Sequence, residues 1–171
     1  MTRRHMVLAL VLGIAALPSA AFSLEDDRDQ PLRVEARHVN MDEASGKIVY
    51  SGNVVAVKGS LRITADRAVI VRRQGRTEHL QLTGRPLTMD QKPDPESPAI
   101  HAEARRLEYD LLSGEVELFD DVLISQGDDK LKSAYVFYKL DGSVIRARAA
   151  EGTDDRVQGV FYPQSDKRDV P

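Results

Sequence analysis

The sequence predicts an all-β protein, and three observations support that fold class. Apolar and polar residues alternate with a period of two in residues 32–37, 61–65, 107–111 and 116–118. Such a period places every second side chain on the same face of a strand. Turn-forming residues recur between these segments, and one part of the chain repeats another. Short strands joined by tight turns account for all three observations.

The chain begins with the features of a secretory signal peptide. Two arginines precede an apolar run from Met6 to Leu17, and a proline and small residues follow it. A membrane-spanning helix needs about 20 apolar residues, so this run is too short to remain as an anchor. We expect residues 1–23 to be a signal peptide, cleaved after Ala21 or after Ser23. The alternative is an uncleaved anchor with its arginines on the cytoplasmic side.

Charge and cysteine content limit the partners and the chemistry of the mature chain. Removal of the signal peptide leaves 22 Lys and Arg residues against 27 Asp and Glu residues, a net charge of −5. This acidic balance argues against nucleic acid as a partner. We expect one domain over residues 24–163 and a polar tail over residues 164–171. The chain has no cysteine, so thiol chemistry and disulfides are excluded.

The chain aligns with itself at an offset of 68 residues. When residues 34–59 are laid on residues 102–127 without gaps, eight of 26 positions are identical. The identities include the turn pairs Ser45-Gly46 and Ser113-Gly114. The two halves therefore share one supersecondary plan, as in stacked β-layers, a solenoid or a jelly roll.

The terminal strands of such a stack expose unpaired backbone N–H and C=O groups. Pro31 and two arginines, Arg33 and Arg37, blunt the first edge only in part, and the last apolar stretch, Val157 to Tyr162, carries little charge. We therefore predict that subunits add head to tail by strand pairing. This heterologous contact does not close and produces filaments.

Several short segments occur in an order and at a spacing that one known family shares. They are Asp29-Gln30-Pro31-Leu32, Tyr50-Ser51-Gly52-Asn53-Val54, Gly59-Ser60-Leu61, Thr64-Ala65-Asp66-Arg67, Gly84-Arg85-Pro86, Gln91, His101-Ala102, Tyr109 and Gln126-Gly127. This set resembles the LptA (OstA) family of periplasmic lipopolysaccharide-transport proteins. No single segment is specific for the family, but the ordered set is, and it extends from Asp29 to Pro163.

The resemblance implies a slightly open, twisted β-jelly roll of about sixteen antiparallel strands, whose interior holds the acyl chains of lipopolysaccharide. It also implies a periplasmic bridge of subunits joined end to end. That bridge connects an inner-membrane-anchored partner of the same fold to the periplasmic domain of an outer-membrane assembly protein. The family is not enzymatic and uses no cofactor. Energy comes from a cytoplasmic ATPase, and this sequence contains no P-loop spacing.

Two groups of apolar residues are predicted to line the interior. The first matches family positions that face the groove and agrees with the local alternation: Leu32, Val34, Met89, Tyr109 and Leu111. The second follows from strand alternation alone: Ile48, Tyr50, Ile63, Leu107, Val116, Leu118, Leu131 and Phe137. Alternation does not distinguish a groove residue from a core residue, so both interpretations remain open. Arg72 is a candidate cation at the rim, where a phosphorylated headgroup would lie.

Other chemistry-bearing residues are assigned to structure. The histidines His38, His79 and His101 lack metal-ligand spacing, so no metal site is predicted. Four acidic pairs lack the spacing of a calcium loop and are expected at turns. They are Asp26-Asp27, Asp120-Asp121, Asp128-Asp129 and Asp154-Asp155. The segment from Gln91 to Pro98, with three prolines, predicts an irregular loop.

Two functions from other classes compete with the carrier. An enzyme acting on cell-wall sugars would need a carboxylate pair such as Glu103 and Glu115. An aromatic content of 5% without tryptophan is unfavourable for a sugar-stacking cleft. The second alternative is a structural β-solenoid that polymerises without a ligand. A carrier should retain lipid through detergent-free purification, and a scaffold should not.

Overall fold

The computed structural model describes residues 30–92 and 96–163. The predicted signal peptide, its two cleavage points and the tail over residues 164–171 lie outside the described residues. Every regular element in the described part of the chain is a strand, so the predicted all-β fold class is confirmed. No helix there is long and apolar enough to cross a membrane.

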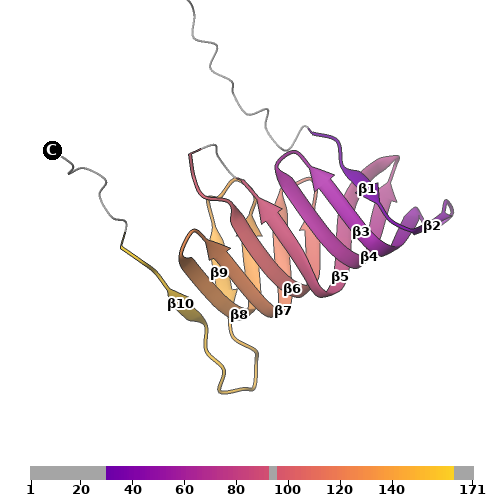
Figure 1. The fold of residues 1–171 in the computed structure, drawn as a ribbon. Coiled ribbons are helices and arrows are strands. Elements are labelled where there is room, and N and C mark those ends of the chain that lie inside the picture. The colour runs from indigo at the N-terminus through magenta and orange to yellow at the C-terminus, as the bar shows by residue number, and fades with distance from the viewer. Residues whose placement is uncertain (1–29, 93–95, 164–171) are drawn as a thin grey trace, which may run out of the picture.

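Ten strands form one antiparallel sheet (Figure 1). They are β1 (Arg33–Glu35), β2 (His38–Asp42), β3 (Lys47–Lys58), β4 (Leu61–Arg73), β5 (Arg76–Gln91), β6 (Ile100–Asp110), β7 (Glu115–Gln126), β8 (Asp129–Lys139), β9 (Ile145–Arg148) and β10 (Gln158–Val160). The strand order is β1-β3-β4-β5-β6-β7-β8-β10, with β2 also beside β3 and β9 also beside β8. From β2 to β9, strands that follow each other along the chain are therefore neighbours in the sheet, as hairpins require.

The six long strands, β3 to β8, bend near their middle. Each pairing between two of them skips residues there, as between Glu103 and Arg106 of β6. Extra residues in a ladder form bulges, and bulges bend strands and increase their twist. The two arms of each strand consequently face each other across an interior, and the hairpin turns lie on the side away from the bends (Figure 1). We call that side the open side.

The bends divide the sheet into two layers. Layer A contains β2, β9 and the arms 47–51, 67–73, 76–83, 106–110, 115–119 and 135–139. Layer B contains β1, β10 and the arms 54–58, 61–64, 87–91, 100–104, 122–126 and 129–133. The expected count of about sixteen strands is not confirmed, because each long strand runs through both layers as one element. Each layer nevertheless holds eight strand segments.

The core lies between the layers. One cluster of apolar side chains from both layers fills this space, and its most buried members include Leu82, Leu107 and Leu118. Removing such a side chain from water contributes about 1.5–3 kcal/mol each. The fold is therefore held together mainly by contact between the two inner faces of one folded sheet.

The internal repeat is visible in the strands. At the offset of 68 residues, β3 corresponds to β7, and β1 with β2 corresponds to the two arms of β6. The turns agree as well. Asp42 Oδ1 accepts hydrogen bonds from the N–H groups two and three residues later, and Asp110 Oδ1 does the same. The predicted common plan of the two halves is therefore a pair of equivalent hairpins.

The predicted loop from Gln91 to Pro98 is shorter in the structure. Gln91 is the last residue of β5, and β6 begins at Ile100. Residues 93–95 lie outside the described residues. Gln91 stays in the strand because its backbone pairs with Ile100 and its side chain is buried in the interior.

Candidate functional site

The structure brings all but one of the predicted interior residues into a single cluster. Seven are buried there: Ile48, Ile63, Met89, Leu107, Tyr109, Val116 and Leu118. Five are partly buried and pack against them: Leu32, Val34, Tyr50, Leu111 and Leu131. The seven buried residues form a filled core. The five partly buried residues lie at the margins of this core, where side chains also meet solvent.

Phe137 is the exception, and its predicted position is corrected. Its neighbours Val136 and Tyr138 are buried in the interior, so Phe137 points to the outer face of layer A. The cause is the bulge between β7 and β8, where Ala134 lies opposite both Asp120 and Asp121. This mismatch reverses the alternation in β8 between Leu131 and Phe137. On the outer face Phe137 lies under the guanidinium of Arg146, 5.4 Å from the ring centroid.

The apolar inner face continues beyond the part that both layers cover. In β2, Val39 and Met41 pair with Tyr50 and Ile48 and share their face, yet they are 61% and 54% exposed. At the opposite end, Ile145 of β9 pairs with Tyr138 and is 47% exposed. Residues directly opposite each other in antiparallel strands share a face. The interior is therefore closed in the middle and uncovered at both ends of the sheet.

Arg72 is the residue that was predicted as a cation at the rim. It is exposed on β4 near the open side, and its guanidinium donates a hydrogen bond to the carbonyl of Gly75 at 3.0 Å. With Met41 and Ile48 it lines a shallow hollow at the β2 end of the interior. A cation thus lies beside the uncovered apolar face.

The interior also contains a polar pair that alternation did not predict. The Tyr138 hydroxyl donates to Gln91 Oε1 at 2.7 Å, and Gln91 Nε2 donates to the carbonyl of Leu140 at 2.9 Å. Gln91 and Tyr138 are 2% and 1% exposed. The only sequence signal was the position of Gln91 two residues after Met89, which places both on the same face of a strand.

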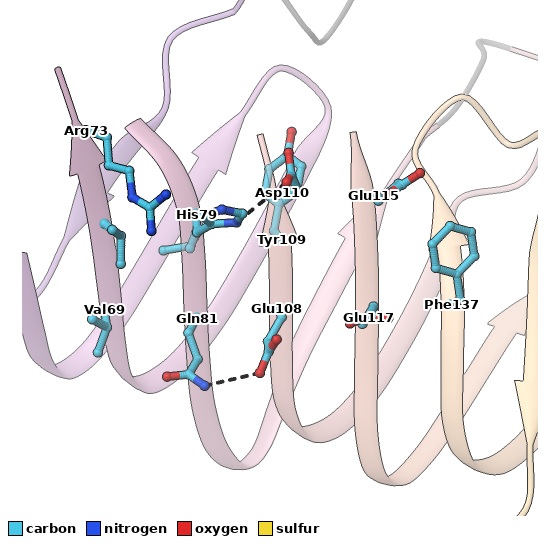
Figure 2. Close-up of a pocket in the computed structure, with 12 residues that line it drawn as sticks. Val69, Arg73, His79, Gln81, Glu108, Tyr109, Asp110, Glu115, Glu117 and Phe137 are labelled. Carbon is cyan, nitrogen blue, oxygen red and sulfur yellow. Dashed lines mark hydrogen bonds and ion pairs between the residues drawn. The ribbon is translucent and has the colours of Figure 1, made fainter. Parts of the chain in front are cut away.

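A surface hollow lies on the outer face of layer A (Figure 2). It crosses β4 to β8 and is lined by several carboxylates, among them Glu108, Asp110 and Glu117. These have partners: Gln81 Nε2 lies 3.3 Å from Glu108, His79 lies 3.6 Å from Asp110, and the Tyr135 hydroxyl donates to Glu117 at 2.6 Å. The lining is mixed, because Val69, Val71 and Phe137 lie beside these polar groups, and the sheet itself separates the hollow from the interior.

The carboxylate pair considered for an enzyme is not assembled. Glu115 lies on the outer face of layer A in this hollow, whereas Glu103 lies on the arm of β6 that belongs to layer B. A glycosidase needs its two carboxylates on opposite sides of one bond, about 5–10 Å apart and in one cleft. These two side chains do not share a cleft.

The three histidines are surface residues. His101 Nδ1 lies 2.7 Å from Asp90 Oδ1, and His101 Nε2 lies 3.6 Å from Glu103 Oε1. The hydrogen bond that His101 donates to Asp90 raises the pKa of His101 above its usual value, with a smaller contribution from Glu103. Within residues 30–92 and 96–163, no three His, Asp or Glu side chains gather in a way that would hold a metal ion.

The family follows from a comparison with known proteins. A family model described as LptA/(LptD N-terminal domain) LPS transport protein matches residues 33–144, which include β1 to β8. The chain belongs to this family. The resemblance drawn from the ordered sequence segments is thereby confirmed.

Individual relatives agree with this membership. The chain is 28% identical over 165 residues to the lipopolysaccharide export system protein LptH of Pseudomonas aeruginosa, and the match covers 92% of this chain and 94% of LptH. It is 29% identical over 161 residues to the export system protein LptA of Escherichia coli K12, covering 93% and 84%. The LptA of Haemophilus influenzae is 28% identical over 148 residues, covering 85% and 84%.

A solved structure supports the same fold. The crystal structure of LptH from Pseudomonas aeruginosa superposes with a TM-score of 0.73 at 26% sequence identity. The superposition covers 80% of this chain and 99% of the LptH chain. LptH is described there as the LptA-homologous periplasmic component of a conserved lipopolysaccharide transport device. The slightly open jelly roll predicted from the resemblance is therefore the fold of this chain.

Proposed function

We propose that this chain carries lipopolysaccharide across the periplasm, with the acyl chains held between layers A and B. The observation that carries the proposal is the continuous apolar inner face, covered in the middle and uncovered at both ends. Relatives that match nearly the whole chain are named as lipopolysaccharide export proteins. Glu103 and Glu115 do not form a catalytic pair, and the proposed role is transport without catalysis.

Burial of acyl methylenes supplies the affinity in this proposal. One buried methylene contributes about 0.8 kcal/mol, so an acyl chain of about ten methylenes gains roughly 8 kcal/mol. Ordering of the chain and imperfect contact reduce that gain. The central side chains, such as Leu107 and Leu118, already fill the interior. An acyl chain would therefore enter at the margins, along Val34, Leu111 and Leu131, and part the layers as it advances.

End-to-end assembly forms the second part of the proposal. All strand pairs are antiparallel, and each layer has an even number of segments, so the first and last segments of a layer run in opposite directions. A second copy displaced along the sheet would place its β2 beside β9 and its β1 beside β10. Both joints would then continue the antiparallel order, which allows regular backbone pairing.

Side chains at the layer A joint are complementary. On the inner face, Ile145 of β9 would meet Val39 and Met41 of the next copy, so three exposed apolar residues would become covered. On the outer face, Arg146 and Arg148 would lie beside the strand that ends in Asp42. Opposite charges across a strand pair stabilise it modestly. The partners proposed at the ends of the row are an inner-membrane-anchored protein of the same fold and the periplasmic domain of an outer-membrane assembly protein.

A charge placed at the margin tests the acyl-chain site. Leu111→Asp or Val34→Asp should fold, because both residues are only partly buried, but each should lose lipopolysaccharide, because an isolated carboxylate in an apolar site is costly. The measurement is photo-crosslinking of lipopolysaccharide to the purified variants, with the melting temperature as a check of folding.

Leu112→Asp is the matched control for that test. Leu112 follows Leu111 directly but is 59% exposed, so its substitution should leave crosslinking unchanged. Full crosslinking in folded Leu111→Asp and Val34→Asp would reject the acyl-chain site. Lipid that copurifies without detergent, seen by native mass spectrometry, would separate a carrier from a ligand-free scaffold.

Two blocked variants test the assembly. Met41→Asp should block the β2 end and Ile145→Asp the β9 end, because each puts a carboxylate into an apolar joint. Light scattering should show that the oligomers of the wild type become larger as the concentration rises. Each variant alone should remain a monomer. An equimolar mixture should give dimers and nothing larger. The intact β9 end of Met41→Asp can join the intact β2 end of Ile145→Asp, and both outer ends of that dimer are blocked. Growth of either variant alone, or no dimer in the mixture, would exclude head-to-tail joining through these strands.

A further inference from the structure

The Gln91–Tyr138 pair joins the two layers across the interior. Gln91 ends the β5 arm in layer B, and Tyr138 lies near the end of the β8 arm in layer A. The Tyr138 hydroxyl donates to Gln91 Oε1, and Gln91 Nε2 donates to the carbonyl of Leu140. We call these two hydrogen bonds the Gln91–Tyr138 bridge. It lies at the open side, where both arms end.

A cleft on the open side reaches this bridge. The cleft has a volume of about 350 Å³. Ile100 and Gln126 line it from layer B, and Tyr138, Asp141 and Ile145 line it from layer A. Tyr138 therefore belongs both to the wall of the cleft and to the bridge. We call this opening the side cleft.

The apolar interior begins immediately behind the bridge. Met89 precedes Gln91 on the inner face of β5, and Val136 precedes Tyr138 on the inner face of β8. Both Met89 and Val136 are completely buried in the central cluster. The bridge thus lies between the side cleft and the proposed acyl-chain site.

We propose that the side cleft is a port through which an acyl chain enters and leaves the interior, and that the Gln91–Tyr138 bridge is its reversible closure. This inference rests on the proposed lipid-carrying function. It adds a route from the side, in the C-terminal half of the sheet, to the openings at the two ends. The ligand class is a single saturated acyl chain.

The layers separate at a lower cost in free energy at the Gln91–Tyr138 bridge than at the apolar contacts between them. When two apolar surfaces separate, the cost in free energy grows with the apolar area that becomes exposed to water. When hydrogen-bonded groups separate, water replaces their partners, and the net loss of free energy is small. The amide and phenol at the bridge therefore hydrate on opening, which the apolar residues elsewhere between the layers do not.

The closure also persists over a wide pH range. Burial, with a smaller contribution from the Asp141 carboxylate, raises the pKa of Tyr138 to about 12. The phenol consequently stays protonated and continues to donate its hydrogen bond at any pH near neutrality. Opening is then a matter of lipid contact and layer motion, and not of proton uptake.

A link across the side cleft tests the port. The chain has no cysteine, so a Gln126→Cys, Asp141→Cys double variant can be joined specifically by a short bismaleimide. The control is the same variant with both thiols capped by N-ethylmaleimide, so that the samples differ only in the link. Stopped-flow fluorescence would follow uptake of a dansyl-labelled undecanoic acid. We expect uptake by the linked protein to be at least about tenfold slower.

A pair of tyrosine substitutions tests the bridge. Tyr138→Phe removes one hydrogen bond from the bridge and keeps the ring, so uptake should become about threefold to tenfold faster. Tyr135→Phe is the matched control, because it removes a hydrogen bond to Glu117 from the same strand on the outer face. Its uptake rate should equal that of the wild type. Melting temperatures would show whether both variants remain folded.

The outcomes separate this inference from the proposed function. If the capped and linked proteins bind the probe with equal rates, acyl chains enter at the ends only, and the port is rejected while the carrier stands. If neither binds the probe at any concentration, the proposed acyl-chain site itself is rejected. Equal rates for Tyr138→Phe and Tyr135→Phe would leave the bridge without a gating role and overturn that part of the inference.

Discussion

At the scale of single residues, strand register decides which charges meet. Asp90 and His101 are far from consecutive in the sequence but lie directly opposite each other in β5 and β6. Their side chains point to the outer face of layer B and form a hydrogen bond of 2.7 Å. Glu103, two residues further along β6, lies on the same face. Two carboxylates beside a histidine favour the charged form of its imidazole.

This arrangement predicts a raised pKa for His101. Nuclear magnetic resonance titration of its ring protons should give a pKa above the usual 6.5. Asp90→Asn should lower that pKa more than Glu103→Gln does, because the Asp90 hydrogen bond is the largest cause of the shift. An unchanged pKa in Asp90→Asn would contradict the geometry of this pair.

The raised pKa also sets the sign of a pH effect on stability. Protonated His101 is favoured in the folded state, so its contribution is fully present below about pH 6.5 and is lost as the pH rises through the folded pKa. The side chain is 42% exposed, and solvent screens the pair, so the effect is small. Urea unfolding of wild type and Asp90→Asn at several pH values should differ most on the acidic side.

At the scale of elements, tight turns depend on backbone conformations that favour glycine. Gly46, in the turn between β2 and β3, has a φ of +66°, and an added Cβ would lie 2.4 Å from the carbonyl oxygen of Arg72. Gly75, in the turn between β4 and β5, has a φ of +76° but open space around it. The two turns therefore need glycine for different reasons.

The comparison of these glycines gives a stability prediction. Gly75→Ala should cost about 1 kcal/mol of unfolding free energy, because only the left-handed backbone conformation is strained. Gly46→Ala should cost at least about 2 kcal/mol more, because the backbone of β4 must also move away. Chemical unfolding curves of the two variants would measure this difference. Equal costs would show that the β4 backbone yields without strain.

At the scale of the whole molecule, the two-layered sheet is well covered only in its middle. Leu107 and Leu118 are enclosed by both layers, whereas Leu131 lies at a margin and is partly exposed. Stability should therefore be concentrated in the central strands β5 to β7. The ends of the sheet remain available for strand pairing, and the open side remains available for parting of the layers.

This gradient predicts different costs for the same substitution. Leu107→Ala should lower the unfolding free energy by about 2–5 kcal/mol, because it leaves a cavity in a packed core. Leu131→Ala should cost clearly less, because solvent already reaches that side chain. Urea unfolding at low protein concentration would measure both without end-to-end contacts. Similar costs would mean that the interior is as closed at the margin as in the centre.

The sequence alone determined much of this protein because the relevant signals are local. The period of two predicted the strands and placed Leu107 and Val116 on their inner faces. The turn-forming residues between these segments predicted the turns. The repeat predicted two equivalent hairpins, and the ordered family segments predicted the jelly roll. The strands and turns depend on residues within one strand or one turn. The repeat and the family segments are recognised from the order of residues along the chain, so no contact in space was needed to infer them.

Tertiary structure decided what depends on residues far apart in the chain. The bulge opposite Ala134 reversed the alternation in β8 and turned Phe137 outward, which local parity does not reveal. The bending of one sheet into two layers brought Gln91 to Tyr138 across the interior, 47 residues away in sequence. Which side chains meet across two layers depends on where each strand bends. That position is set jointly by neighbouring strands, and not by any strand alone.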